Sequence, residues 1–159
     1  MQAKEYIAVL VQSLDRKAEL LDLIISKNKE QRIFFLDEDT EPEKLEKNIS
    51  EKAELVQRLE KLDEGFEQVY ERVRTELSAD PEAYREEILH MQNAIKMITE
   101  KIATVQTQEI RNKELAKKRF TQIHGKIRQV RTSSKVASQY YKSMANLHVT
   151  EPGFMDKKK

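Results

Sequence analysis

The longest uninterrupted helical pattern in the chain covers residues 80–142, which read DPEAYREEILHMQNAIKMITEKIATVQTQEIRNKELAKKRFTQIHGKIRQVRTSSKVASQYYK. Asp80 suits the position before a helix, where its carboxylate accepts from free backbone N–H groups. Pro81 suits the first helical position because it has no N–H to leave unpaired. The next proline is Pro152. We therefore predict one long helix over 81–142.

Apolar residues recur along the first half of this pattern in steps that alternate between four and three residues. This spacing is typical of a helix that packs along its whole length against other helices. The residues are Tyr84, Ile88, Met91, Ile95, Ile98, Ile102 and Val105. A polar interval follows over 106–114, broken only by Ile110, and we expect the helix to continue, kink or break there.

A second run of apolar residues, which we call the C-terminal seam, follows the polar interval. Its phase is shifted by an extra four-residue step, which predicts a stutter that relaxes any left-handed supercoil. The C-terminal seam consists of Ala116, Phe120, Ile123, Ile127, Val130, Ala137 and Tyr141, with Ser134 at one position.

Two further helices are predicted before this pattern, over 3–36 and 42–77, because the same four-three spacing recurs in each. The acidic segment 37–42, DEDTEP, separates them, and Thr40 has the spacing of a capping box with Glu43. A connection this short makes the two helices antiparallel neighbours.

The predicted fold class is therefore all-α. An antiparallel hairpin of long helices and a long third helix form a three- to four-helix bundle of coiled-coil character. Residues 1–145 make one helical domain, and 146–159, which contain Pro152, Gly153 and three terminal lysines, are expected to be a flexible tail.

The predicted helix lengths imply that the hairpin is too short to cover the C-terminal seam. At a rise of 1.5 Å per residue, the two hairpin helices are each about 50 Å long and a third helix over 81–142 is about 90 Å long. We therefore expect the hairpin to cover the third helix only to about Val105. The C-terminal seam must then fold back, pair with a second copy of the chain, or bind a different protein.

Charge is divided between the two halves of the chain. Residues 1–81 hold 13 basic and 20 acidic side chains, a net charge of −7, and residues 82–159 hold 16 and 8, a net charge of +8. Residues 111–159 alone hold 13 basic and 3 acidic side chains. A basic arm raises the possibility of nucleic-acid binding, but no nucleic-acid motif accompanies it, so a solvated or acid-binding surface is favoured.

Catalytic and metal-binding patterns are missing from the sequence. The chain has no cysteine, His90, His124 and His148 are far apart, and its three glycines are isolated rather than grouped in a phosphate-binding loop. No apolar run approaches the length of a membrane span. We predict a cytoplasmic protein that is not an enzyme and binds no metal or cofactor.

Several segments, in their order along the chain, resemble the flagellar export chaperones of the FlgN family. They are YIAVL at 6–10, LLDL at 20–23, KAELV at 52–56, LEKL at 59–62, the pair Tyr140 and Tyr141, and FMDKKK at 154–159. The resemblance covers nearly the whole chain and depends on pattern and order rather than on one motif.

This resemblance implies a function. Members of the family are bacterial cytoplasmic proteins that bind the C-terminal helices of hook-associated proteins and deliver them to the flagellar type III export gate. It implies that the C-terminal seam at Phe120, Ile123, Ile127, Val130, Ala137 and Tyr141 binds the client, and that Tyr140 or Tyr141 docks on the export gate. The alternatives are a structural coiled-coil or assembly protein, including a homodimer, and a nucleic-acid binder.

Overall fold

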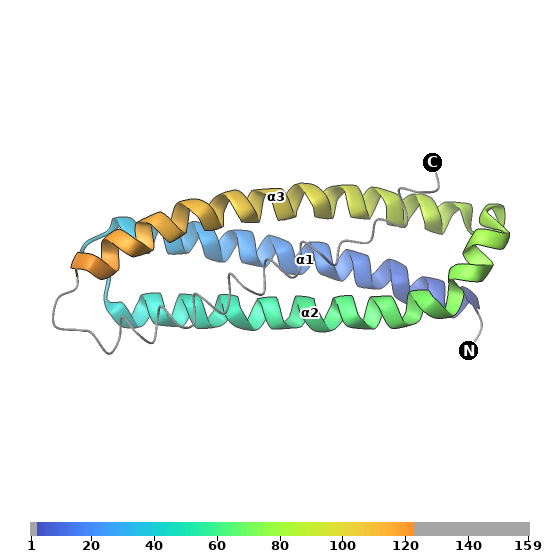
Figure 1. The fold of residues 1–159 in the computed structure, drawn as a ribbon, viewed down its shortest axis with the longest axis horizontal. Helices are drawn as coiled ribbons and strands as arrows, with labels where there is room; N and C mark the ends of the chain where they lie inside the picture. The colour runs from blue at the N-terminus through green and yellow to red at the C-terminus, as the bar shows by residue number, and fades with distance from the viewer. Residues whose placement is uncertain (1–2, 123–159) are drawn as a thin grey trace.

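The computed structural model describes residues 3–122. Three long helices, α1 (Ala3–Leu36), α2 (Pro42–Ala79) and α3 (Arg85–Gln122), are joined by one short loop and by the 3-10 turn η1 (Pro81–Tyr84). Figure 1 shows them lying side by side, with α1 and α3 running in one direction and α2 in the other. The predicted all-α bundle is confirmed, and no strand occurs within the described range.

The core of α3 follows an unbroken four-three register from Ile88 to Arg119. Glu109 and Asn112 occupy core positions inside the polar interval, so α3 passes through 106–114 as one helix without the stutter expected from its apolar residues alone. The register positions are Ile88, Met91, Ile95, Ile98, Ile102, Val105, Glu109, Asn112, Ala116 and Arg119, and all are buried.

The hairpin helices keep the same spacing and also mix apolar and polar residues in the core. On α1 the buried register runs through Ile7, Leu10, Leu14, Lys17, Leu21, Ile24, Asn28, Gln31 and Phe35. On α2 it includes Leu45, Ile49, Lys52, Val56, Leu59, Phe66, Val73 and Leu77. Burial of these apolar faces supplies most of the stability of such helices, since tertiary packing of an amphipathic face contributes more than helix propensity.

The helix ends differ from the capping expected from sequence. Glu41, not Thr40, is the residue before α2, and it makes no side-chain cap. Thr40 is buried, and its carbonyl oxygen accepts from the Arg119 side chain of α3. Asp80 precedes the turn η1 rather than an α-helix, also without a side-chain cap, and α3 begins only at Arg85. In the loop, Asp37 Oδ1 accepts from the backbone N–H of Asp39 at 2.9 Å.

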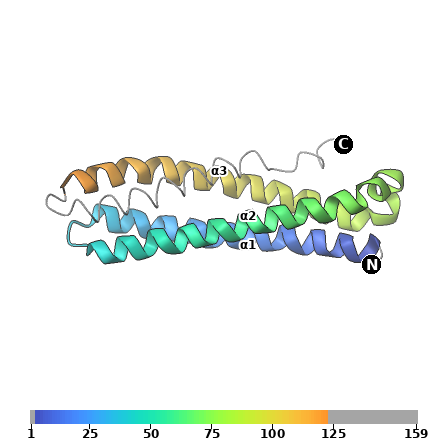
Figure 2. The same ribbon diagram turned by 60° about the horizontal axis from the view of Figure 1, so that its bottom comes forward.

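Helix α1 is the common neighbour in the bundle. It packs closely against both other helices, whereas no Cα atom of α2 lies within 8 Å of a Cα atom of α3. In Figure 2 α3 runs beside the hairpin from η1 to the α1–α2 loop. The hairpin therefore accompanies α3 as far as Gln122, beyond the limit near Val105 that helix lengths suggested. The reason is length: α1 and α2, of 34 and 38 residues, match the 38 residues of α3, so a hairpin that starts beside η1 reaches Gln122.

Candidate functional site

The predicted client-binding residues are divided by the limit of the described range. Phe120 lies inside it, and Ile123, Ile127, Val130, Ala137 and Tyr141 lie outside it, as does Tyr140, the other residue predicted to dock on the export gate. Phe120 is half-buried, and its ring meets the ring of Phe35 edge-on, with centroids 6.5 Å apart. It belongs to a small apolar cluster at the loop end of the bundle, together with Leu45 and Ala116. Phe120 therefore has a packing role in the bundle.

Arg119 fixes the end of α3 to the loop between α1 and α2. Its Nη1 donates to the carbonyl oxygen of Glu38 at 2.9 Å, and its Nη2 donates to the carbonyl oxygen of Thr40 at 2.7 Å. The side chain is buried although it is charged, and two charge-assisted bonds offset part of the cost of removing it from water. The hairpin and the described part of α3 consequently end at the same level.

A layer of hydrogen-bonded polar side chains crosses the core about two turns before Arg119. At its centre, Lys52 Nζ lies 2.7 Å from Glu109 Oε1 and donates to Gln31 Oε1 at 3.2 Å. We call it the polar layer, and it consists of Asn28, Gln31, Asn48, Lys52, Glu109 and Asn112. It draws on all three helices, so it aligns them in one register, as polar core residues do in coiled coils.

Burial argues against a catalytic role for this layer. The side chains of Lys52 and Glu109 are only 2% and 7% exposed, so neither can touch a substrate without opening the bundle. A second buried pair, Lys17 and Asp63, whose charged atoms are 2.9 Å apart, has the same structural character nearer the middle of the hairpin. Sequence reasoning missed both because it followed apolar residues only. Extending the four-three spacing through polar residues would have identified the members of both pairs as core positions.

The buried lysine predicts a dependence of stability on pH. Burial lowers the pKa of Lys52 below its ordinary value, and Glu109 opposes this only in part. Between the folded and unfolded pKa values, the unfolded chain therefore binds more protons than the folded chain. We expect the free energy of unfolding to gain a contribution from Lys52 as pH rises through the alkaline range just below the ordinary lysine pKa.

Urea unfolding over a pH series tests this expectation, with Lys52→Met/Glu109→Leu as the reference variant. Burial raises the pKa of Tyr70, which lowers the free energy of unfolding as pH rises above the ordinary tyrosine pKa, but Tyr70 is present in both proteins and cancels in the comparison. The difference in free energy of unfolding between the natural chain and the variant should change with pH in favour of the natural chain. A constant difference would contradict the assignment.

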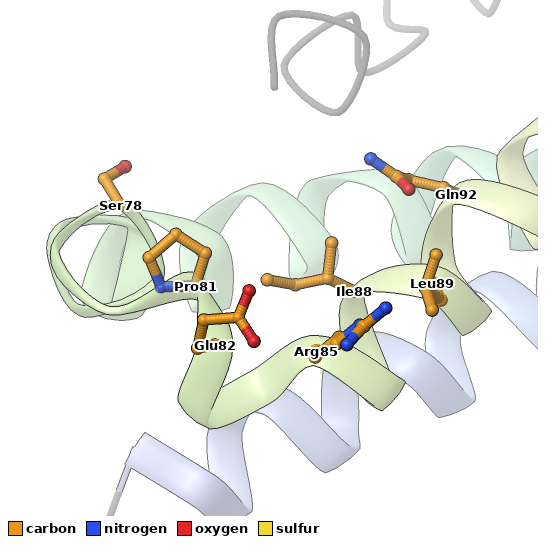
Figure 3. Close-up of a pocket in the computed structure, with 7 residues that line it drawn as sticks. All are labelled: Ser78, Pro81, Glu82, Arg85, Ile88, Leu89 and Gln92. Carbon is orange, nitrogen blue, oxygen red and sulfur yellow. The ribbon is translucent and has the colours of Figure 1, made fainter. Parts of the chain in front are cut away.

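A pocket opens at the other end of the bundle, at the corner formed by α2, η1 and α3. We call it the corner pocket, and it has a volume of about 400 Å³. Figure 3 shows Ile88 between Pro81 and Leu89, with the charged groups of Glu82 and Arg85 along one edge. Ser78 and Gln92 complete the lining. The apolar floor and charged edge suit an aromatic or aliphatic side chain from a charged peptide.

Other chemistry is sparse in the part of the chain that the structure describes. No group of three or more His, Cys, Asp or Glu side chains there is arranged to hold a metal ion. His90 Nε2 instead lies 2.9 Å from Asp15 Oδ1 in a pair that is half exposed on both sides. None of the described helices has both the length and the apolarity needed to cross a membrane.

Comparisons with protein-family models, with curated proteins and with solved structures found no match.

Proposed function

We propose that the protein is a flagellar type III export chaperone that binds the C-terminal helices of hook-associated proteins. In this proposal the part of the C-terminal seam from Ile123 to Tyr141 receives the client helix, and Tyr140 or Tyr141 contacts the export gate. Ala116 and Phe120, the first residues of the seam, pack within the bundle instead. The family resemblance of the sequence is one support. A bacterial cytoplasmic location follows from the same proposal.

The structural observation that supports it is the docking of Arg119 on the carbonyl groups of Glu38 and Thr40. The hairpin turns at this level, so a helix that continues past Gln122 in the direction of α3 has no hairpin beside it. The apolar residues at 123, 127 and 130 then require a partner. An amphipathic client helix supplies one by packing its apolar face along the seam.

The charge of this segment favours an acidic client. Residues 123–142 hold five basic side chains and no acidic one. Complementary charge accelerates encounter between partners and reduces binding of basic competitors. The segment therefore combines an apolar seam for affinity with a basic surround for selectivity.

The test is capture of C-terminal peptides from hook-associated proteins of the same genome by the full chain. We expect Ile127→Ala/Val130→Ala to weaken capture at least about tenfold, because one lost apolar anchor of about 1.4 kcal/mol corresponds to a factor of ten. The melting temperature should stay nearly unchanged, since these residues are assigned to the client.

Phe120→Ala serves as the matched comparison. Phe120 packs on Phe35, so its truncation should lower the free energy of unfolding by about 1–2 kcal/mol, less than for a fully buried phenylalanine. Undiminished capture by Ile127→Ala/Val130→Ala would refute the proposal. A concentration-dependent dimer in sedimentation experiments that the same variant abolishes would instead assign the seam to a homodimer.

A further inference from the structure

We propose that the C-terminal end of the chain, Phe154–Lys159, binds in the corner pocket of its own bundle. Composition alone predicts a flexible tail, and the corner pocket provides an intramolecular partner for it. Three independent properties support this occupant: the shape and polarity of the pocket, its surrounding charge, and the length of chain available.

The pocket provides an apolar floor that is open to a side chain from outside the bundle. Leu89 is 49% exposed and adjoins the buried Ile88. Pro81 adds a rigid apolar wall opposite Leu89 (Figure 3). Phe154 and Met155 are the apolar residues of the tail's end, and an aromatic ring gains much of its binding energy from burial in such a site.

Charge around the pocket complements the last residues of the chain. The segment 76–87, which forms the corner, holds five acidic side chains and one basic side chain. Asp80, Glu82 and Glu86 are all exposed there. Residues 154–159 hold three lysines and one aspartate. The three lysines follow Phe154 by three to five residues, so with Phe154 in the pocket they are able to reach the acidic side chains of the corner.

The chain is long enough to reach the pocket from the end of α3. Leu89 lies 33 residues before Gln122, a distance of about 50 Å along a helix. Phe154 lies 32 residues after Gln122, which spans about 48 Å if helical and more wherever the chain is extended. Pro152 and Gly153 end any helix just before Phe154, so the end of the chain is able to turn into the pocket.

The consequence for activity depends on the proposed function. A tail anchored at the corner holds residues 123–153 back along the bundle, tethered at Gln122 and at Phe154. The C-terminal seam is then restrained beside the bundle until the tail is released. Client capture and tail binding therefore compete, and release of Phe154 should strengthen capture.

The test uses the full chain, which contains no natural cysteine, so introduced cysteines react alone. In the variant Ser78→Cys/Met155→Cys, a short bismaleimide should form an intramolecular cross-link in the absence of client. The control is Ser50→Cys/Met155→Cys. Ser50 is exposed on the same helix but lies near Lys52, whose partner Glu109 is close to the end of α3. A free tail would therefore meet Ser50 at least as often as Ser78.

We expect the Ser78 pair to cross-link at least about tenfold faster than the Ser50 pair, and the addition of Phe154→Ala to remove this preference. Equal rates for the two pairs would overturn the inference, and so would a rate that Phe154→Ala leaves unchanged. A product of twice the chain mass would also overturn it, because a second copy would then supply the tail. These measurements contain no client, so their failure leaves the proposed function standing. Conversely, a positive cross-link combined with no client capture, even by Phe154→Ala, would support tail binding and refute the chaperone.

Discussion

Glu109→Leu should destabilise the bundle by about 3–5 kcal/mol, the largest effect expected for one substitution. Glu109 Oε1 lies 2.7 Å from Lys52 Nζ, in a layer where the lysine side chain is 2% exposed. Removing the carboxylate leaves a buried cation without its counter-charge, in contact with the neutral amide oxygen of Gln31. The cost is the desolvation of that cation without its counter-charge, not the loss of a single hydrogen bond.

Denaturant unfolding of Glu109→Leu and of the double variant Lys52→Met/Glu109→Leu measures this effect. The double variant should recover most of the loss and be neutral or more stable by about 1–4 kcal/mol, because two well-packed apolar chains replace the ion pair. Glu114→Leu is the matched control, since Glu114 is exposed on the same helix and should change stability by less than about 0.5 kcal/mol. A loss under about 1 kcal/mol for Glu109→Leu would mean that Lys52 reaches water.

Arg119→Met should cost about 2–4 kcal/mol and free the last turn of α3 from the loop. The guanidinium makes two bonds to backbone carbonyls at 2.9 Å and 2.7 Å, and each charge-assisted bond contributes about 1.5–3 kcal/mol. The stabilisation by these two bonds is reduced because Arg119 Nε is buried without a hydrogen-bond partner among the described residues. Methionine keeps much of the apolar stem, so the change isolates the charged group.

Hydrogen exchange of the backbone amides distinguishes a local from a global effect. Amides in the last two turns of α3, near Leu115 and Phe120, should exchange faster in Arg119→Met relative to those around Met91. Lys118→Met, one position away and exposed, should leave both regions unchanged. Protection at Phe120 equal to that of the natural chain would show that the Phe35 contact alone holds the end of α3.

The contacts of Arg119 hold the end of the described part of α3 level with the α1–α2 loop, where the hairpin ends. Upstream of Gln122, the buried register of α3 packs within the bundle, and Phe120 packs partly buried against Phe35. Downstream, the C-terminal seam needs a client, a second copy or its own bundle. In the proposed function the partner is the client. While the tail is bound in the corner pocket, the partner is the protein's own bundle.

Local patterns were sufficient to predict the helices and the all-α class. The four-three spacing of Ile7, Val11 and Leu14 and its repeats report which face of a helix is buried, and the acidic break before Pro42 interrupts that spacing. Both signals depend on residues a few positions apart, so one sequence contains them. The same holds for the start near Pro81, although the first four residues there form a 3-10 turn.

Contacts between residues far apart in the sequence determine the polar layer and the corner pocket. Glu109 and Asn112 look like solvent-facing residues in a polar interval, and they are buried because Lys52, Asn28 and Gln31 on other helices meet them. Hydrogen bonding to such distant groups is what makes burial of a polar side chain affordable, and no local pattern reveals it. The corner pocket has the same origin: Ser78 and Leu89 form one site only because the chain turns at η1 and brings the two helix ends together.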